Sequence, residues 1–241
     1  MKIKVADFNV EIRNRFNLIE KLCKDYIGDF DKADFVIAVT EADIEREKKR
    51  PNFQPEFKDP YIEMVVVYRK LCFMFPERDA IMLHSAVFSL EDKVVALVAN
   101  SGVGKTTHMR FYKELFGDAL TVINGDKPII RSIGSELFVY GTPWCGKEGL
   151  NTNTKAKLTD LCFIHRSDQN STVPMDNALA VGKLLRQIYL PKTGLAAENT
   201  LEMLNRLLVK CRVWEVNCTN DIEAAKNSYK AIFKEGEKNE T

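Results

Sequence analysis

Two different periods of hydrophobic and polar residues follow one another along the chain, and they predict an α/β fold. Residues 2–10 alternate apolar and polar side chains, which is typical of a half-buried strand, whereas residues 16–26 carry apolar side chains at helical spacing. Residues 34–40 contain the apolar run of a second strand. Residues 42–50 form a charged helix that ends before Pro51. The first part of the chain therefore reads as strand, helix, strand, helix.

Prolines between residues 51 and 60 separate this first part from the rest of the chain. The next segment, residues 61–75, is compatible with a helix or a strand, and its length favours a helix from about Tyr68. We therefore predict two domains, a small N-terminal α/β accessory region over residues 1–60 and a larger core over residues 61–241.

Beyond residue 75 the pattern predicts several consecutive strands. We expect strands over residues 86–90, 94–99, 120–124, 128–132, 136–140, 158–164 and 213–216, and helices over residues 106–116, 178–188, 201–208 and 221–234. Because several strands follow one another without a helix between them, a purely parallel doubly wound sheet is not expected. The core is therefore predicted to be α/β with a mixed β-sheet.

The strongest chemical signal in the chain follows the aliphatic strand at residues 94–98. Residues 99–106 read Ala-Asn-Ser-Gly-Val-Gly-Lys-Thr, which matches the phosphate-binding loop G-x-x-x-x-G-K-[ST] with Ala in the first glycine position. Gly102 and Gly104 allow the main chain to approach phosphate oxygens closely. The helix that follows would add aligned N–H donors and partial positive charge. The alternative is a glycine turn that binds nothing.

The loop side chains have separate expected roles. Lys105 would place a full positive charge at the terminal phosphates, and Thr106 would offer a hydroxyl to Mg²⁺. We therefore predict that ATP, or another phosphate donor, binds here together with Mg²⁺. The predicted nucleotide-binding residues are Asn100, Ser101, Gly102, Val103, Gly104, Lys105, Thr106 and Thr107.

A phosphate-binding loop does not define a reaction, because the metal and the acceptor need a further group. Asp126 follows an apolar strand about twenty residues after the loop. In an α/β sheet, strand ends near such a loop face the ligand crevice. We therefore predict that Asp126 binds Mg²⁺ or accepts a hydroxyl proton, with a simple turn residue between two strands as the alternative.

Two further segments are candidates for the same site. His84 lies fifteen residues before the loop and across a predicted hairpin, so we count it with Lys105 and Asp126 as a catalytic candidate. Trp144 and Lys147 lie in a glycine-flanked loop after a strand, and we predict that they contact the substrate. The alternative for Trp144 is a packing anchor.

Composition restricts the partners and the location of the protein. Thirty-five Lys and Arg oppose 34 Asp and Glu, so the concentrated positive field that binds nucleic acid or an anionic membrane is not expected. The longest apolar run, residues 64–67, is too short for a membrane span, and no apolar leader follows Met1. The six cysteines form no CxxC pair, which is typical of reduced buried thiols. We therefore expect a cytoplasmic protein.

Four segments together resemble the HPr kinase-like branch of the phosphoenolpyruvate carboxykinase superfamily, namely residues 84–86, 98–107, 123–127 and 141–147. The chain looks most like the small stand-alone members, some of which phosphorylate serine on a protein, on a peptide or as the free amino acid. The resemblance covers residues 80–165 well and the C-terminal helices loosely. It implies a P-loop kinase core with a mixed sheet and ATP- and Mg²⁺-dependent phosphoryl transfer to a hydroxyl.

The resemblance also implies residue roles. Residues 101–107 would hold the nucleotide phosphates, and Thr106 and Asp126 would hold Mg²⁺. His84 would match the histidine that precedes the loop in the family, and residues 144–147 would lie on the acceptor side. Because HPr kinases form ring-like oligomers, a homo-oligomer is also a possible state of this chain.

The chain departs from the family at one position. HPr kinases carry two adjacent Asp, one acting as base and the other at the metal, where this chain has Gly125 and Asp126. A single carboxylate must then serve both purposes, or another residue helps, or transfer is lost. Two alternatives to the kinase therefore stay open, a nucleotide-binding regulatory or assembly protein and a carboxykinase acting on a C4 acid. The chain is short for the latter and lacks a surplus of Arg near the loop.

Overall fold

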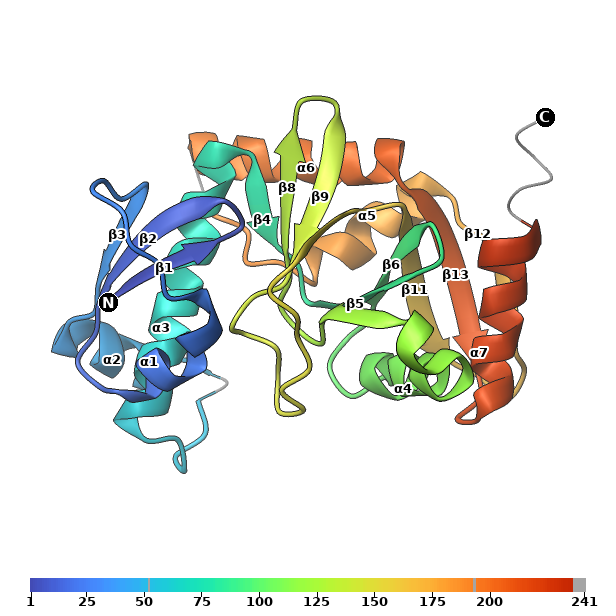
Figure 1. Ribbon diagram of the computed structural model, residues 1–241, viewed down its shortest axis with the longest axis horizontal. Coiled ribbons are helices and arrows are strands. Elements are labelled where there is room, and N and C mark those ends of the chain that lie inside the picture. The colour runs from blue at the N-terminus through green and yellow to red at the C-terminus, as the bar shows by residue number, and fades with distance from the viewer. Residues whose placement is uncertain (52, 193, 236–241) are drawn as a thin grey trace.

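The computed structural model describes residues 1–51, 53–192 and 194–235 (Figure 1). The strands are β1 (Lys2–Val5), β2 (Phe8–Arg13), β3 (Phe35–Ala38), β4 (Ala80–Met82), β5 (Ser85–Leu90), β6 (Lys93–Val98), β7 (Thr121–Asn124), β8 (Ile129–Ile133), β9 (Glu136–Tyr140), β10 (Lys155–Lys157), β11 (Asp160–Arg166), β12 (Ser171–Pro174) and β13 (Arg212–Cys218). The helices are α1 (Leu18–Leu22), α2 (Glu41–Lys48), α3 (Asp59–Met74), α4 (Lys105–Phe116), α5 (Asn177–Leu185), α6 (Leu195–Lys210) and α7 (Ile222–Tyr229). Short 3₁₀ turns occupy Lys24–Tyr26, Phe75–Arg78 and Gly117–Ala119, and a π-helical turn occupies Lys230–Glu235.

The described strands form three sheets, and the predicted α/β class with mixed sheets is confirmed. A three-stranded sheet has the order β1-β2-β3, and an antiparallel four-stranded sheet has the order β10-β9-β8-β4. The largest sheet has the order β12-β13-β11-β6-β5-β7, in which β13, β11 and β6 run parallel. The remaining pairs of this sheet are antiparallel. The carboxyl ends of β6, β11 and β13 therefore meet at one edge.

The single strand predicted over residues 2–10 is wrong, because two strands with a tight turn occupy that region. Ala6 and Asp7 adopt φ angles of 53° and 58°, and β1 pairs with β2 in antiparallel register. The buried side chains advance in steps of two up to Val5, but the next buried strand position is Phe8. The two-residue alternation of apolar positions is thus interrupted between Val5 and Phe8, and this interruption indicates the turn in the sequence.

The helix predicted from about Tyr68 begins nine residues earlier, at Asp59. Pro60 lies in its first turn, where a missing N–H breaks no intrahelical bond. Buried residues of α3, among them Ile62 and Leu71, join those of β1 and β2 in one hydrophobic core. That core contains residues from both sides of position 60, and a division into domains at that point stays a prediction.

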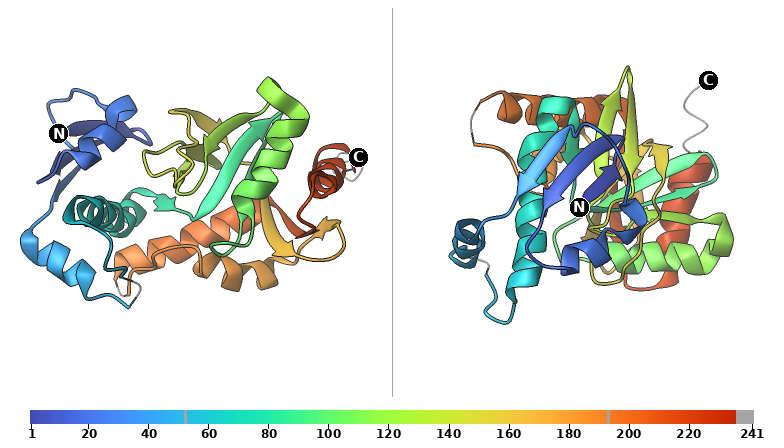
Figure 2. Two further views of the ribbon diagram at one scale, coloured as in Figure 1. Left: turned by 90° about the horizontal axis from the view of Figure 1, so that it is seen from below. Right: turned by 60° about the vertical axis from the view of Figure 1, so that its left-hand side comes forward.

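Helices cover both faces of the six-stranded sheet, as the view from below shows (Figure 2). One core joins alternate strand residues such as Val98 and Phe163 to α5 and α6. A second core joins the intervening residues, such as Leu97 and Cys162, to α4 and α7. This burial on both sides explains why β6 is apolar from Val94 to Val98, since central strands covered by helices have no solvent-exposed face.

The histidine of α4 belongs to this second layer. His108 is 3% exposed, and its Nε2 lies 3.0 Å from Ser228 Oγ, which also lies 2.9 Å from the hydroxyl of Tyr112. The Ser228 hydroxyl lies within hydrogen-bond distance of the carbonyls of Ala224 and Ala225. With its one proton donated there, it accepts from the imidazole and the phenol. His108 is therefore a satisfied core residue with a neutral ring.

Acid is expected to destabilise the fold through His108. Burial lowers its pKa from 6.5 to about 4, so the unfolded chain binds a proton between these pH values that the folded chain does not. Stability should therefore fall as the pH drops from 6.5 to 4, by up to about 3 kcal/mol from this group. Urea unfolding at a series of pH values between 6.5 and 4 measures this loss. In His108→Gln, the free energy of unfolding should fall less over this range than in the wild type. An equal fall in the free energy of unfolding in both proteins would contradict the assignment of His108 as a buried neutral residue.

Two sequence features can be compared directly with the structure. None of the helices among the described residues is long and apolar enough to cross a membrane. All six cysteines are unpaired, and all except Cys145 are buried.

Candidate functional site

The predicted phosphate-binding loop lies between β6 and α4, as its sequence predicts. Gly102 and Gly104 have φ angles of 80° and 127°, which residues with a Cβ rarely adopt. Gly104 directly precedes α4, whose first N–H groups have no partner within the helix and point out of its N-terminal end. The local backbone therefore has the shape and the polarity of an anion-binding turn.

A cleft of about 750 Å³ opens beside this loop, and we call it the Asp126 cleft. Loop and α4 residues, including Lys105 and Thr106, line one part of it, and α3 residues such as Tyr68 line another. His84 and Asp126 also line it. Every predicted nucleotide-binding residue from Ser101 to Thr107 borders it except Val103, which lines a neighbouring cleft. Asn100 reaches the site through a side-chain hydrogen bond to Gln187.

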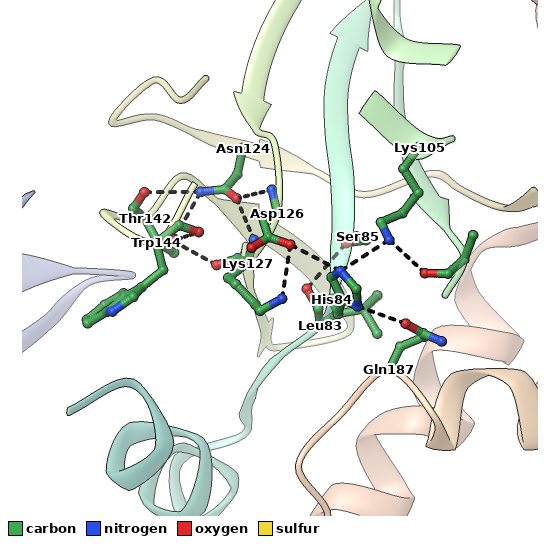
Figure 3. Close-up of polar contacts among 11 residues, drawn as sticks. Leu83, His84, Ser85, Lys105, Asn124, Asp126, Lys127, Thr142, Trp144 and Gln187 are labelled. Carbon is green, nitrogen blue, oxygen red and sulfur yellow. Dashed lines mark hydrogen bonds and ion pairs between the residues drawn. The ribbon is translucent and has the colours of Figure 1, made fainter. Parts of the chain in front are cut away.

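One carboxylate oxygen of Asp126 contacts both His84 and Lys127 (Figure 3). This oxygen, Oδ1, lies 3.1 Å from Nε2 of His84 and 3.0 Å from Nζ of Lys127. Burial raises the pKa of Asp126, but the hydrogen bonds and charges of His84 and Lys127 outweigh burial and hold that pKa below its ordinary value. The carboxylate is therefore ionised at neutral pH.

Lys105 reaches the same centre from the opposite direction (Figure 3). Its ammonium donates to the carbonyl of Ala99 at 2.7 Å and lies 3.2 Å from Nε2 of His84. Burial lowers the pKa of Lys105 to about 8, although the charge of Asp126 acts in the other direction. The structure thus brings the three predicted catalytic residues, His84, Lys105 and Asp126, together around one imidazole nitrogen.

Asn124, which the sequence analysis did not select, shapes the turn that carries Asp126. It is fully buried, and its Oδ1 accepts the main-chain N–H groups of Asp126 at 2.9 Å and Lys127 at 2.7 Å. Its Nδ2 donates to the carbonyl and the hydroxyl of Thr142. An Asn at a strand end before Gly is a turn signal that could have found it.

Gln187 was also missed, and no local pattern marks it. It follows α5, is 6% exposed and bonds to both His84 and Asn100. The contact joins residues 103 positions apart in the chain, so only the tertiary fold reveals it.

The two predicted substrate residues differ in exposure. Trp144 is 6% exposed, packs into the N-terminal core and has its ring 6.1 Å from that of Tyr68. Its Nε1 is buried without a hydrogen-bond partner among the described residues. Lys147 is exposed and lines the Asp126 cleft. Both border the cleft, and contact of either with a substrate stays a prediction.

Main chain crowds the space in which a side chain at Gly125 would lie. A Cβ built on Gly125 would lie 3.1 Å from the carbonyl oxygen of Cys145 and 3.3 Å from that of Leu150. The Gly125 N–H also donates to Leu150 at 2.8 Å. A larger residue would require this main chain to shift by a few tenths of an ångström, so Gly125 suits the turn that presents Asp126.

The donor atoms in the cleft suit Mg²⁺ bound together with phosphate. The described residues contain no group of three or more His, Cys, Asp or Glu side chains that could hold a metal ion. Mg²⁺, however, often takes one or two protein oxygens and completes its shell with phosphates and water. The Thr106 hydroxyl and the Asp126 carboxylate are such hard oxygen donors, and both line the Asp126 cleft.

A second cleft, of about 770 Å³, lies on the other side of the loop, and we call it the Arg166 cleft. It is lined by residues after β11 and β13, such as Asp168 and Thr219, together with Phe111 of α4. The Arg166 guanidinium borders both clefts and donates to the carbonyls of Gly102 at 2.5 Å and Val103 at 3.1 Å. The loop therefore forms a partition between two recesses.

Comparisons with known proteins add little. No protein-family model matches the chain, and no curated protein matches it. Among solved structures, the chain is similar to the HPr(Ser) kinase/phosphatase from Coxiella burnetii, at 9% identity and a TM-score of 0.35. That match covers 64% of this chain and 98% of the other. We draw no conclusion from a likeness this remote.

Proposed function

We propose that the protein is an ATP- and Mg²⁺-dependent kinase that transfers a phosphoryl group to a hydroxyl, a serine of a peptide, a protein or a small molecule. The observation that carries this proposal is the convergence of Lys105 and Asp126 on one cleft beside the glycine loop. Phosphoryl transfer needs a cation that binds the transferred phosphate. It also needs an ionised carboxylate that binds the metal and the acceptor hydroxyl.

Catalysis in this arrangement is mostly positioning. The loop N–H groups and Lys105 would hold the terminal phosphates, and Thr106 and Asp126 would hold Mg²⁺. The bound ion supplies neutralisation of the charge on the phosphate oxygens. Asp126, kept ionised by His84 and Lys127, would accept the hydrogen bond of the acceptor hydroxyl and orient it for in-line attack.

The two clefts suit different parts of the reactants. The Arg166 cleft lies at the carboxyl ends of parallel strands, where open α/β sheets bind ligands, and we assign it to the nucleoside. The Asp126 cleft, which contains the carboxylate, is then the place for the acceptor.

The experiment is a transfer assay with purified protein, Mg²⁺-ATP and a panel of serine, serine peptides and cell-extract fractions. ADP formation together with a product heavier by one phosphoryl group in mass spectrometry is the expected result. ATP binding without turnover across the panel would contradict the kinase.

That outcome would favour a nucleotide-binding regulatory or assembly protein. One observation supports this second candidate, because the main chain around Gly125 crowds the position at which HPr kinases carry a second carboxylate.

A further inference from the structure

We propose that Gln187 is a positioning residue that locks His84 and Asn100 into one arrangement, and so keeps the phosphate loop in register with Asp126. This inference rests on the proposed kinase function. Gln187 comes from the segment after α5, outside the loop, the hairpin and the turn that supply the other site residues. It is the fourth element to reach the centre of the site.

Hydrogen bonds hold both the side-chain amide and the main chain of Gln187. Its Oε1 lies 3.0 Å from Nδ1 of His84 (Figure 3). Its Nε2 donates to Oδ1 of Asn100 at 2.7 Å. Its main-chain carbonyl accepts the N–H of His84 at 2.8 Å, and its own N–H donates to Leu184 at 2.8 Å. At 6% exposure, little solvent is present to replace these bonds.

These bonds decide which nitrogen of His84 carries the proton. An amide oxygen can only accept, so Nδ1 of the imidazole must be the protonated nitrogen. Nε2 lies 3.2 Å from the Lys105 ammonium and 3.1 Å from the Asp126 carboxylate. In the neutral ring Nε2 accepts from Lys105, and in the doubly protonated ring it donates to Asp126, with Nδ1–H directed at Gln187 in both forms. The other tautomer would turn an N–H toward the ammonium and leave Oε1 of Gln187 without a donor.

The same side chain connects the donor and acceptor halves of the site. Asn100 is the second residue of the phosphate loop, whereas His84 is next to Ser85, whose N–H donates to the carbonyl of Asp126 at 3.1 Å. Hydrogen bonds thus link the loop through Gln187 to His84, and the N–H of the adjacent Ser85 continues this link to Asp126. In-line transfer depends on this spacing, because a displacement of about 1 Å can cost about 100-fold in rate.

Two substitutions separate positioning from folding. Gln187→Met keeps the length of the side chain but removes both hydrogen bonds. Gln187→Glu keeps the acceptor for His84, and the Asn100 amide can turn to donate to it, so this variant should rescue the arrangement. Gln169→Met, at an exposed glutamine between β11 and β12, is the matched control.

The first readout is ¹⁵N NMR of the imidazoles in the full chain, which has only three histidines. The neutral His84 ring should be protonated at Nδ1 in the wild type, in Gln187→Glu and in Gln169→Met. In Gln187→Met it should shift toward protonation at Nε2. An unchanged Nδ1–H signature in Gln187→Met would overturn the proposal, and this result does not depend on any transfer activity.

The second readout is the split between kcat and KM. Gln187→Met should lower kcat by about 10- to 100-fold and change the KM for Mg²⁺-ATP by less than about 3-fold, with Gln187→Glu recovering most of kcat. If Gln187→Met loses the Nδ1–H tautomer of His84 but keeps the wild-type kcat, the positioning role of Gln187 is also overturned. If the wild type transfers no phosphate to any acceptor, the proposed function fails, while the NMR signature still decides whether Gln187 orients His84.

Discussion

Asp126→Asn is expected to lower kcat for phosphoryl transfer by about 10²- to 10⁴-fold. The substitution keeps the size of the side chain but removes the charge that His84 and Lys127 stabilise in the ionised form. The acceptor hydroxyl would lose its proton acceptor, and the metal would lose its one carboxylate ligand in the turn. The measurement is steady-state kinetics with a saturating acceptor, together with the Mg²⁺ concentration for half-maximal rate, which should rise.

The fold should tolerate this change. The main-chain N–H of residue 126 still donates to the buried Asn124, so the turn keeps its shape. Asp118→Asn, at a fully exposed carboxylate at the end of α4, is the matched control and should leave kcat unchanged. Retention of more than about a tenth of the wild-type kcat by Asp126→Asn would exclude Asp126 as the essential carboxylate.

The part of the site that could be predicted is the part encoded by neighbouring residues. The aliphatic strand before residue 99, the two glycines and the helix after residue 105 specify the loop locally, since each contributes a backbone preference of its own. The position of His84 near the loop could also be predicted, because it depends on a hairpin of two strands that are adjacent in the sequence. Adjacent strands β5 and β6 pair directly, with Ser85 opposite Val98, and so bring the residue before β5 to the end of β6.

Contacts between distant segments could not be predicted. Gln187 meets His84 only because α5 packs under the sheet, and nothing in residues 177–192 marks one polar side chain as buried at a site. The crowding at Gly125 has the same origin, because the segment that fills the space lies twenty to twenty-five residues further along the chain. Such contacts depend on tertiary packing and leave no periodic trace in the sequence.

The start of α3 and the role of Trp144 were difficult to predict for a different reason, namely that the local pattern fits two interpretations. The predicted start of α3 is too late because the Tyr, Arg and Lys residues that favour a helix over a strand begin only at residue 68, whereas the proline in the first turn of α3 is the better guide. Trp144 illustrates a real ambiguity, since an aromatic residue in a glycine-flanked loop suits both packing and ligand contact. Here it lies in the N-terminal core and on the wall of the Asp126 cleft at the same time.

Lys105→Ala is expected to weaken ATP binding by about 10- to 100-fold, because a charged donor to phosphate contributes about 1.5–3 kcal/mol. Isothermal titration calorimetry with ATP and with ADP measures the effect. The loss should be larger for ATP, since the lysine of such a loop reaches the terminal phosphates. Lys105→Met, which keeps the apolar stem, is the matched variant and should lose a similar factor.

Loss of stability is not expected to account for the weaker ATP binding, because burial of the wild-type ammonium opposes folding. Burial lowers the pKa of Lys105 from 10.5 to about 8, so the unfolded chain binds this proton more tightly than the folded chain. At pH 7 that difference opposes folding by about 3 kcal/mol, and it disappears as the pH rises from 8 through 10.5. Lys105→Met should therefore unfold at the same or a higher temperature than the wild type at pH 7. A variant that is equally stable and binds ATP as tightly as the wild type would show that this loop holds no phosphate.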